Sequence, residues 1–219
     1  MELFEKYLKI RWGYVYILNI VIYALMIFIQ YRFVEVDSYY ETYVKPLYNV
    51  QKDYIKAIAE ARFFELYNYL WIPIHVGGLV LLIATYVFLG YTVLNHSISF
   101  KKSMKAVLQS IVIFPLNSLL VTILKASHLI SYTPTTIDDD YFFQSLGRLF
   151  LSANLPDIIY AIFEKFNLVE LVFCVLLALI LNQELAMKFK KTFLLTSIIY
   201  LFGTIISICF IYSFKFLTN

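Results

Sequence analysis

The chain has little charge for its length, and this shortage excludes a soluble globular protein. Of its 219 residues only 15% are Asp, Glu, Lys or Arg, whereas 61% are hydrophobic. Ordinary soluble domains contain about 25% charged and about 45–50% apolar residues. Apolar surface in such excess needs a lipid solvent, so we expect the lipid bilayer to be the first partner of this chain.

Cysteine and histidine are scarce as well. Cys174 and Cys209 both fall inside apolar runs, where a thiol packs as a small hydrophobe, and they form neither a disulfide framework nor a metal-ligand spacing. The chain has three histidines and no GxSxG, HExxH, P-loop or GxGxxG sequence. We therefore expect no enzymatic activity, no cofactor and no metal.

Long apolar runs are abundant. A helix rises about 1.5 Å per residue, so about 20 apolar residues cross a hydrocarbon core of about 30 Å. The sequence predicts an all-α, polytopic membrane helical bundle that forms a single membrane domain over residues 1–219. The predicted spans cover residues 14–34, 70–94, 106–124, 166–183 and 192–214. The fourth contains Glu170, and its uncharged part alone is short for a full crossing.

The positions of Lys and Arg predict the orientation, because cytoplasmic loops retain positive charge during insertion. Basic residues cluster before the first span and in the loops that follow the second and fourth spans, whereas most acids lie in the two other loops, residues 35–69 and 125–165. We expect a multi-pass protein of the inner (cytoplasmic) membrane with a cytoplasmic N-terminus and an external or periplasmic C-terminus. The net charge is only +3, and the basic residues lie in short clusters beside apolar runs and not along one groove. We therefore expect no nucleic acid partner. The basic clusters are Lys6, Lys9 and Arg11; Lys101, Lys102 and Lys105; and Lys188, Lys190 and Lys191.

The two external loops are long enough to have structure of their own. Residues 49–69 show apolar positions at helical spacing and predict an amphipathic extension of the second span. Residues 141–151 and 155–166 mix aromatic with charged residues, which is typical of interfacial segments. Between the loop's ends lies the acidic run Asp138, Asp139 and Asp140, which is either a solvated turn or a divalent-cation site.

The third predicted span carries polar side chains that need partners in lipid. On a helical wheel Gln109, Ser110 and Asn117 lie within about 100° of each other, with Ser118 beside them. Pro115 predicts a kink, because proline removes one backbone hydrogen bond. Two interpretations remain open for this sector: hydrogen bonds to neighbouring helices, or the lining of a transport path.

Small residues and one acid mark possible packing sites. Gly77, Gly78 and Gly203 permit close approach of helices. Glu170 is either a carboxylate at the headgroup level, balanced by Lys165 or Arg148, or a buried contact with a partner.

The last third of the chain resembles the Yip1-like membrane protein family. The resemblance lies in residues 166–171 (FNLVEL), the apolar run VFCVLLALILN, a basic loop that ends in KFKK, and a final span. Leu179-Ile180-Leu181 stands where that family commonly has a glycine, and the glycine-tyrosine motifs of the eukaryotic members are not evident in the first two spans. The resemblance therefore implies a bacterial-type, five-helix scaffold or permease-like component without established catalytic residues, and it does not imply binding of small GTPases.

These patterns favour a non-enzymatic integral membrane subunit or scaffold of an inner-membrane protein assembly, with other membrane protein subunits as partners. The alternative is a transporter or permease component that moves a small solute or lipid across the membrane. A third hypothesis, an enzyme acting in the membrane, requires His75, His128, Asp157 and Glu170 to converge.

Overall fold

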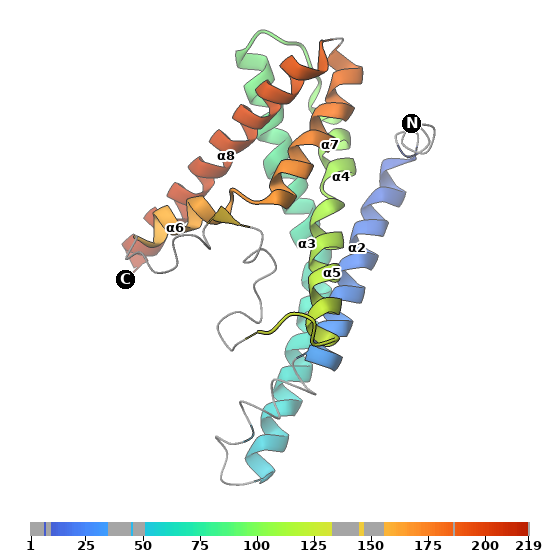
Figure 1. Ribbon diagram of the computed structural model, residues 1–219, viewed down its shortest axis with the longest axis vertical. Helices are drawn as coiled ribbons and strands as arrows, with labels where there is room; N and C mark the ends of the chain where they lie inside the picture. Colours follow the sequence, from blue (N-terminus) through green and yellow to red (C-terminus); the bar gives the residue numbers. More distant parts are fainter. Residues whose placement is uncertain are drawn as a thin grey trace. The chain divides into compact units, whose positions relative to one another are not determined.

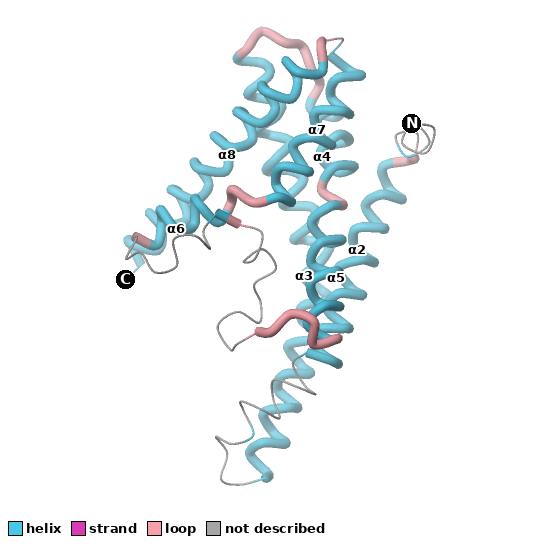
Figure 2. Tube along the Cα trace, viewed as in Figure 1, coloured by secondary structure: helices cyan, strands magenta, loops and turns pink. Residues whose placement is uncertain are grey.

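The computed structural model describes residues 7, 10–34, 45, 51–132, 145–146, 156–185 and 187–218. In chain order the helices are α2 (Trp12–Ile29), α3 (Gln51–Val93), α4 (Phe100–Ser110), α5 (Ile113–Ala126), α6 (Asp157–Glu164), α7 (Leu168–Leu185) and α8 (Phe189–Thr218) (Figures 1 and 2). Within this part of the chain the only extended pairing is an isolated bridge between Ser145 and Asn167. The predicted all-α fold class is confirmed.

Five helical segments are long and apolar enough to cross a bilayer, as predicted. They are Trp12–Val34, Glu65–Val93, Phe100–Ala126, Leu168–Leu185 and Phe189–Ser213. The fourth, which the sequence predicts as the shortest, has 18 residues and is also long and apolar enough to cross. The chain is therefore a multi-pass integral membrane protein.

The third span is interrupted between its two halves. It consists of α4 and α5, with a turn at residues 111–112 between them. Pro115 has no N–H to donate to the carbonyl of Ile111 four residues earlier, so the helical ladder fails at this point. The kink predicted from Pro115 is thus a break between two helices.

Parts of both loops that the sequence predicts to be external are helical. The helix α3 begins at Gln51 and continues through the predicted amphipathic extension into the second span. The short helix α6 lies inside the predicted interfacial segment 155–166. The acidic run at residues 138–140 lies outside the described residues, and so does most of segment 141–151.

The chain divides into two compact units. Unit one contains Met1–Val15, Gly78–Ile113 and Tyr141–Asn219, and unit two contains Tyr16–Gly77 and Phe114–Asp140. In unit one, α7 packs against α4 and α8, and α6 packs against α8.

Unit two joins α2 to the first part of α3 through polar contacts. The Tyr16 hydroxyl donates to the carbonyl of Pro73 at 2.8 Å, and the Asn68 amide donates to the Tyr31 hydroxyl at 2.8 Å. Tyr31 belongs to a π-helical stretch, residues 30–34, that continues α2.

Candidate functional site at the start of α7

The first turn of α7 is capped by a buried asparagine. The first amides of a helix have no partner within the helix, and a side chain just before it can accept from one of them. Asn167 does so, because its Oδ1 accepts from the amide of Glu170 at 2.8 Å. Its Nδ2 donates to the carbonyl of Glu164 at 3.1 Å, so one side chain ties the end of α6 to the start of α7.

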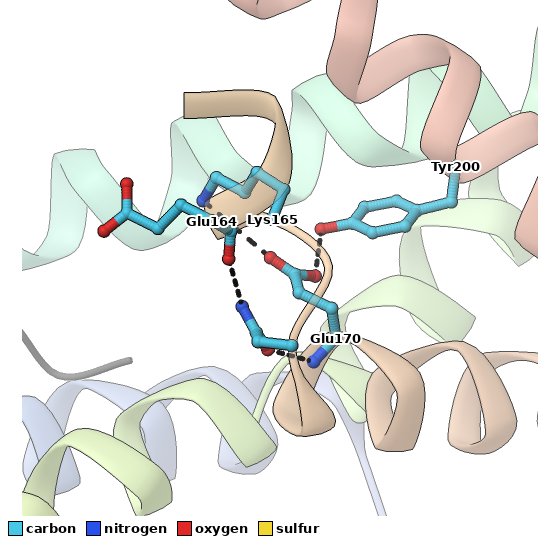
Figure 3. A network of polar contacts seen from close by, with 5 residues as sticks. Glu164, Lys165, Glu170 and Tyr200 are labelled. Atoms are coloured by element: carbon cyan, nitrogen blue, oxygen red, sulfur yellow. Dashed lines mark hydrogen bonds and ion pairs between the residues drawn. The ribbon is translucent and has the colours of Figure 1, made fainter. Parts of the chain in front are cut away.

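This cap places the Glu170 carboxylate between a phenol and an ammonium group (Figure 3). The Tyr200 hydroxyl on α8 donates to one carboxylate oxygen at 2.5 Å. The Lys165 ammonium, from the connection between α6 and α7, lies 3.8 Å from the other oxygen. Glu170 is 7% exposed and Tyr200 6% exposed, so both are buried.

The site is satisfied by groups of the chain itself. A buried carboxylate is costly unless it is paired and hydrogen-bonded, and the positive end of a helix dipole also favours an acid in the first turn. Phe173 packs on Tyr200 with 4.9 Å between ring centroids and holds the phenol in place. One carboxylate, one cation and one phenol suit a polar contact that joins α7, α8 and the connection between α6 and α7. Acid–base chemistry by paired carboxylates would need a second carboxylate at this position.

The sequence indicated this acid and one of its partners. Lys165 was one of two cations expected to balance Glu170, and the other, Arg148, lies outside the described residues. The Asn-x-x-Glu spacing at 167–170 is a helix-start signal that could have indicated the cap. Sequence reasoning missed Tyr200 as the partner, because nothing local relates it to Glu170.

Further polar contacts join α3 to α8 within unit one. The Tyr91 hydroxyl bonds the Thr196 hydroxyl at 2.8 Å and donates to the carbonyl of Thr192 at 3.3 Å. Nearer the end of α8, the hydroxyls of Tyr86 and Ser207 share a short hydrogen bond. The hydroxyls of Tyr86 and Tyr91 thus serve helix–helix contact.

Two glycines allow these helices to approach. A Cβ at Gly90 would lie 2.6 Å from Ile199, and a Cβ at Gly203 would collide with the ring of Tyr86. Gly203 was among the predicted packing glycines, whereas Gly90 was not. The other two predicted positions differ. A Cβ at Gly77 would lie 3.7 Å from the Tyr16 hydroxyl, an ordinary contact, and a Cβ at Gly78 would meet nothing within 4 Å.

The predicted polar sector of the third span is divided. Gln109 and Ser110 end α4 in unit one, whereas Pro115, Asn117 and Ser118 are buried residues of α5 in unit two. A helical wheel places these residues on one face only if the helix is continuous, whereas α4 ends at Ser110 and α5 begins at Ile113.

Within unit one, Gln109 forms a reciprocal contact with the N-terminal segment. The Tyr7 hydroxyl donates to the carbonyl of Gln109 at 2.7 Å, and the Gln109 amide donates to the carbonyl of Tyr7 at 3.3 Å. Burial raises the pKa of Tyr7 to about 12. Ser110 donates to the carbonyl of Ala106 in its own helix at 2.8 Å.

Unit two has a buried acid of similar surroundings. Glu65 is 8% exposed, accepts from the Tyr69 hydroxyl at 3.2 Å and lies 4.0 Å from the guanidinium of Arg32. Among its described residues, each unit therefore holds a buried glutamate that contacts a tyrosine and a cation.

The residues of the enzyme hypothesis fall in different units. His75 and His128 belong to unit two, whereas Asp157 and Glu170 belong to unit one. The ring of Tyr23 lies edge-on to His75, with 5.7 Å between centroids. Among the described residues, no three His, Cys, Asp or Glu side chains gather closely enough to hold a metal ion.

Comparison with protein-family models, with curated proteins and with solved structures finds no match to this chain.

Proposed function

We propose that this protein is a non-enzymatic integral membrane subunit or scaffold of an inner-membrane protein assembly. The observation that carries the proposal is the use of polar side chains in unit one. Glu170, Tyr91 and Tyr86 all bond side chains of α8. Polar groups used in this way fix a rigid helical unit, which is what a scaffold requires.

The buried acid supports the same proposal. Ionisable residues inside membrane segments usually mark ion or substrate pathways, and carriers leave them accessible to the transported species. Glu170 instead has its partners, Lys165 and Tyr200, within the chain. A group satisfied in this manner stabilises the unit and leaves the chain's outer surface for lipid or for another subunit. The resemblance to bacterial Yip1-like proteins points to the same role.

The proposed topology follows from the basic clusters. The third span begins with one cluster, Lys101, Lys102 and Lys105. The other cluster lies at the start of the fifth span, with Lys188 just before it and Lys190 and Lys191 in its first turn. With these residues on the cytoplasmic side, the N-terminus is also cytoplasmic and the C-terminus is external.

Affinity purification of the tagged chain from its native membrane in mild detergent tests the subunit proposal. Mass spectrometry of the eluate should identify at least one other membrane protein in stoichiometric amount. An unrelated tagged multi-pass protein, purified from the same membrane, controls for non-specific capture. A monodisperse monomer that emerges alone from every detergent tested would contradict the proposal.

One observation favours the transporter alternative. The break between α4 and α5 resembles the discontinuous helices that form the binding sites of many transporters. If the broken span lines a path, Asn117→Leu should abolish flux of a fluorescent phospholipid or of labelled small solutes in liposomes. Leu116→Ala, at the exposed neighbouring position, is the matched control. Equal flux in the wild type and in empty liposomes would remove this alternative.

A further inference from the structure

A hollow lies at the connection between α3 and α4 in unit one. Its volume is about 570 Å³, within the range of about 300–1,000 Å³ of small-molecule sites. All of its lining residues except Ile98 carry a polar group in the side chain, although apolar atoms make up much of the wall. They are Thr92, Asn95, His96, Ser97, Ile98, Ser99 and Lys102. The amide of Asn95, the hydroxyl of Ser97 and the ammonium of Lys102 are hydrogen-bond donors suited to an anionic oxygen.

The hollow lies where lipid headgroups are expected. It joins the end of one membrane span, Glu65–Val93, to the start of the next, Phe100–Ala126. Large apolar side chains flank it in the sequence and are exposed: Val93 is 78% exposed and Leu94 43% exposed. A hollow that presents polar groups beside exposed apolar side chains matches an amphipathic ligand with a polar head and acyl chains.

The charge around the hollow is positive. Two lysines beside it on α4, Lys101 and Lys105, are exposed. The connection between α7 and α8 lies at the same end of unit one, because the Lys102 ammonium forms a 2.6 Å ion pair with Glu184 of α7 (Figure 1). That connection and the first turn of α8 add three exposed lysines, Lys188, Lys190 and Lys191. Glu184 is the only acid in residues 92–105 and 182–192.

We propose that this hollow and its lysines bind the phosphate headgroup of an anionic phospholipid. Clusters of Lys at the end of membrane spans attract anionic lipids, and a hollow with several donors gives the headgroup a defined seat. Glu184 competes with the lipid phosphate for Lys102. The proposal does not depend on the scaffold role, since either a subunit or a transporter can hold such a lipid.

The ion pair provides a matched pair of variants. Lys102→Gln and Glu184→Gln break the same contact, and its side chains are 54% and 36% exposed, so either change should cost little stability. Lys102→Gln removes a charge that binds the lipid and should weaken binding about fivefold, whereas Glu184→Gln frees that charge and should strengthen binding about fivefold. A purely structural role for the pair would move both variants in the same direction.

Native mass spectrometry of the full-length purified chain measures the binding. The protein is incubated with phosphatidylglycerol and phosphatidylcholine of identical acyl chains, and the bound fractions are compared. We expect the wild type to retain phosphatidylglycerol preferentially, with Lys102→Gln and Glu184→Gln changing that preference in opposite directions. Ser97→Phe fills the hollow without changing its charge and should abolish the preference, whereas Lys56→Gln, an exposed lysine of α3, should not.

Four outcomes would overturn the proposal. Equal retention of the two lipids by the wild type would show that no anionic headgroup is selected. If Lys102→Gln and Glu184→Gln change the preference in the same direction, the ion pair does not compete with a lipid phosphate. An unchanged preference in Ser97→Phe would show that the lipid does not bind in this hollow. Complete displacement of the lipid by millimolar inorganic phosphate would identify a site for free phosphate.

Discussion

The Tyr200 hydroxyl lies 2.5 Å from a carboxylate oxygen of Glu170, although 30 positions separate the two residues in the sequence. Tyr200 lies on α8, and Glu170 lies in the first turn of α7. Since both are buried, neither can exchange this partner for water. This hydrogen bond therefore stabilises the packing of the last two spans against each other.

Tyr200→Phe should lower the free energy of unfolding by about 1–3 kcal/mol, because it removes a hydrogen bond to a buried charged group. Glu170→Gln should cost a similar amount, since it also removes the ion pair with Lys165. Equilibrium unfolding in detergent micelles measures both. The double variant should lose less stability than the sum of the losses in the two single variants. Strict additivity would show that the two residues do not act together.

Gly90→Ala should destabilise the protein by about 1–3 kcal/mol, because the added Cβ would lie 2.6 Å from Ile199 and would overpack the contact with α8. Gly78→Ala is the control on the same helix, where a Cβ meets nothing within 4 Å. The control should be neutral or slightly stabilising, since alanine favours the helix over glycine. Equal unfolding temperatures for the two variants would contradict the close packing of α3 on α8.

Asn167→Ala should cost about 1 kcal/mol through loss of the cap on α7. Asn167→Asp should retain most of the stability, because its carboxylate can still accept from the amide of Glu170, although it loses the bond to the carbonyl of Glu164. Thermal unfolding followed by circular dichroism distinguishes the two variants. If aspartate proves no better than alanine, the cap is not the reason for the asparagine.

Tyr7→Phe should lower stability by about 1 kcal/mol near neutral pH, since the phenol donates to the carbonyl of Gln109. The folded-state pKa of Tyr7 is about 12, against an ordinary value of 10.0. Because folding raises this pKa, the advantage of the wild type is fully present below pH 10 and is lost as the pH rises towards 12. Unfolding curves of both proteins between pH 7 and about 11.5 test this, and a constant difference would contradict the burial of Tyr7.

The apolar runs predicted the spans well, because in lipid a long uncharged stretch has few alternatives to a crossing helix. The predicted second span, residues 70–94, corresponds to Glu65–Val93, and the predicted fifth, residues 192–214, corresponds to Phe189–Ser213. Pro115 similarly indicated where the third span fails, because the loss of an amide is a local property.

The contacts of the site were less predictable, because they depend on the register between helices. Tyr86 and Ser207 are 121 positions apart, and Tyr91 and Thr196 are 105 apart. No pattern along the chain states which of many tyrosines meets which hydroxyl. Gly90 was missed for the same reason, since only the position of Ile199 gives it a role.

The arrangement of five crossings can be tested most directly by locating the two ends of the helical region. Epitope tags placed before Trp12 and after Ser213 are exposed to protease in intact spheroplasts and, separately, in inverted membrane vesicles. Five spans predict that the two tags are cut from opposite sides, and with the proposed cytoplasmic N-terminus the first is cut only in inverted vesicles and the second only in spheroplasts. Cleavage of both tags from the same side would mean an even number of crossings and would contradict the account.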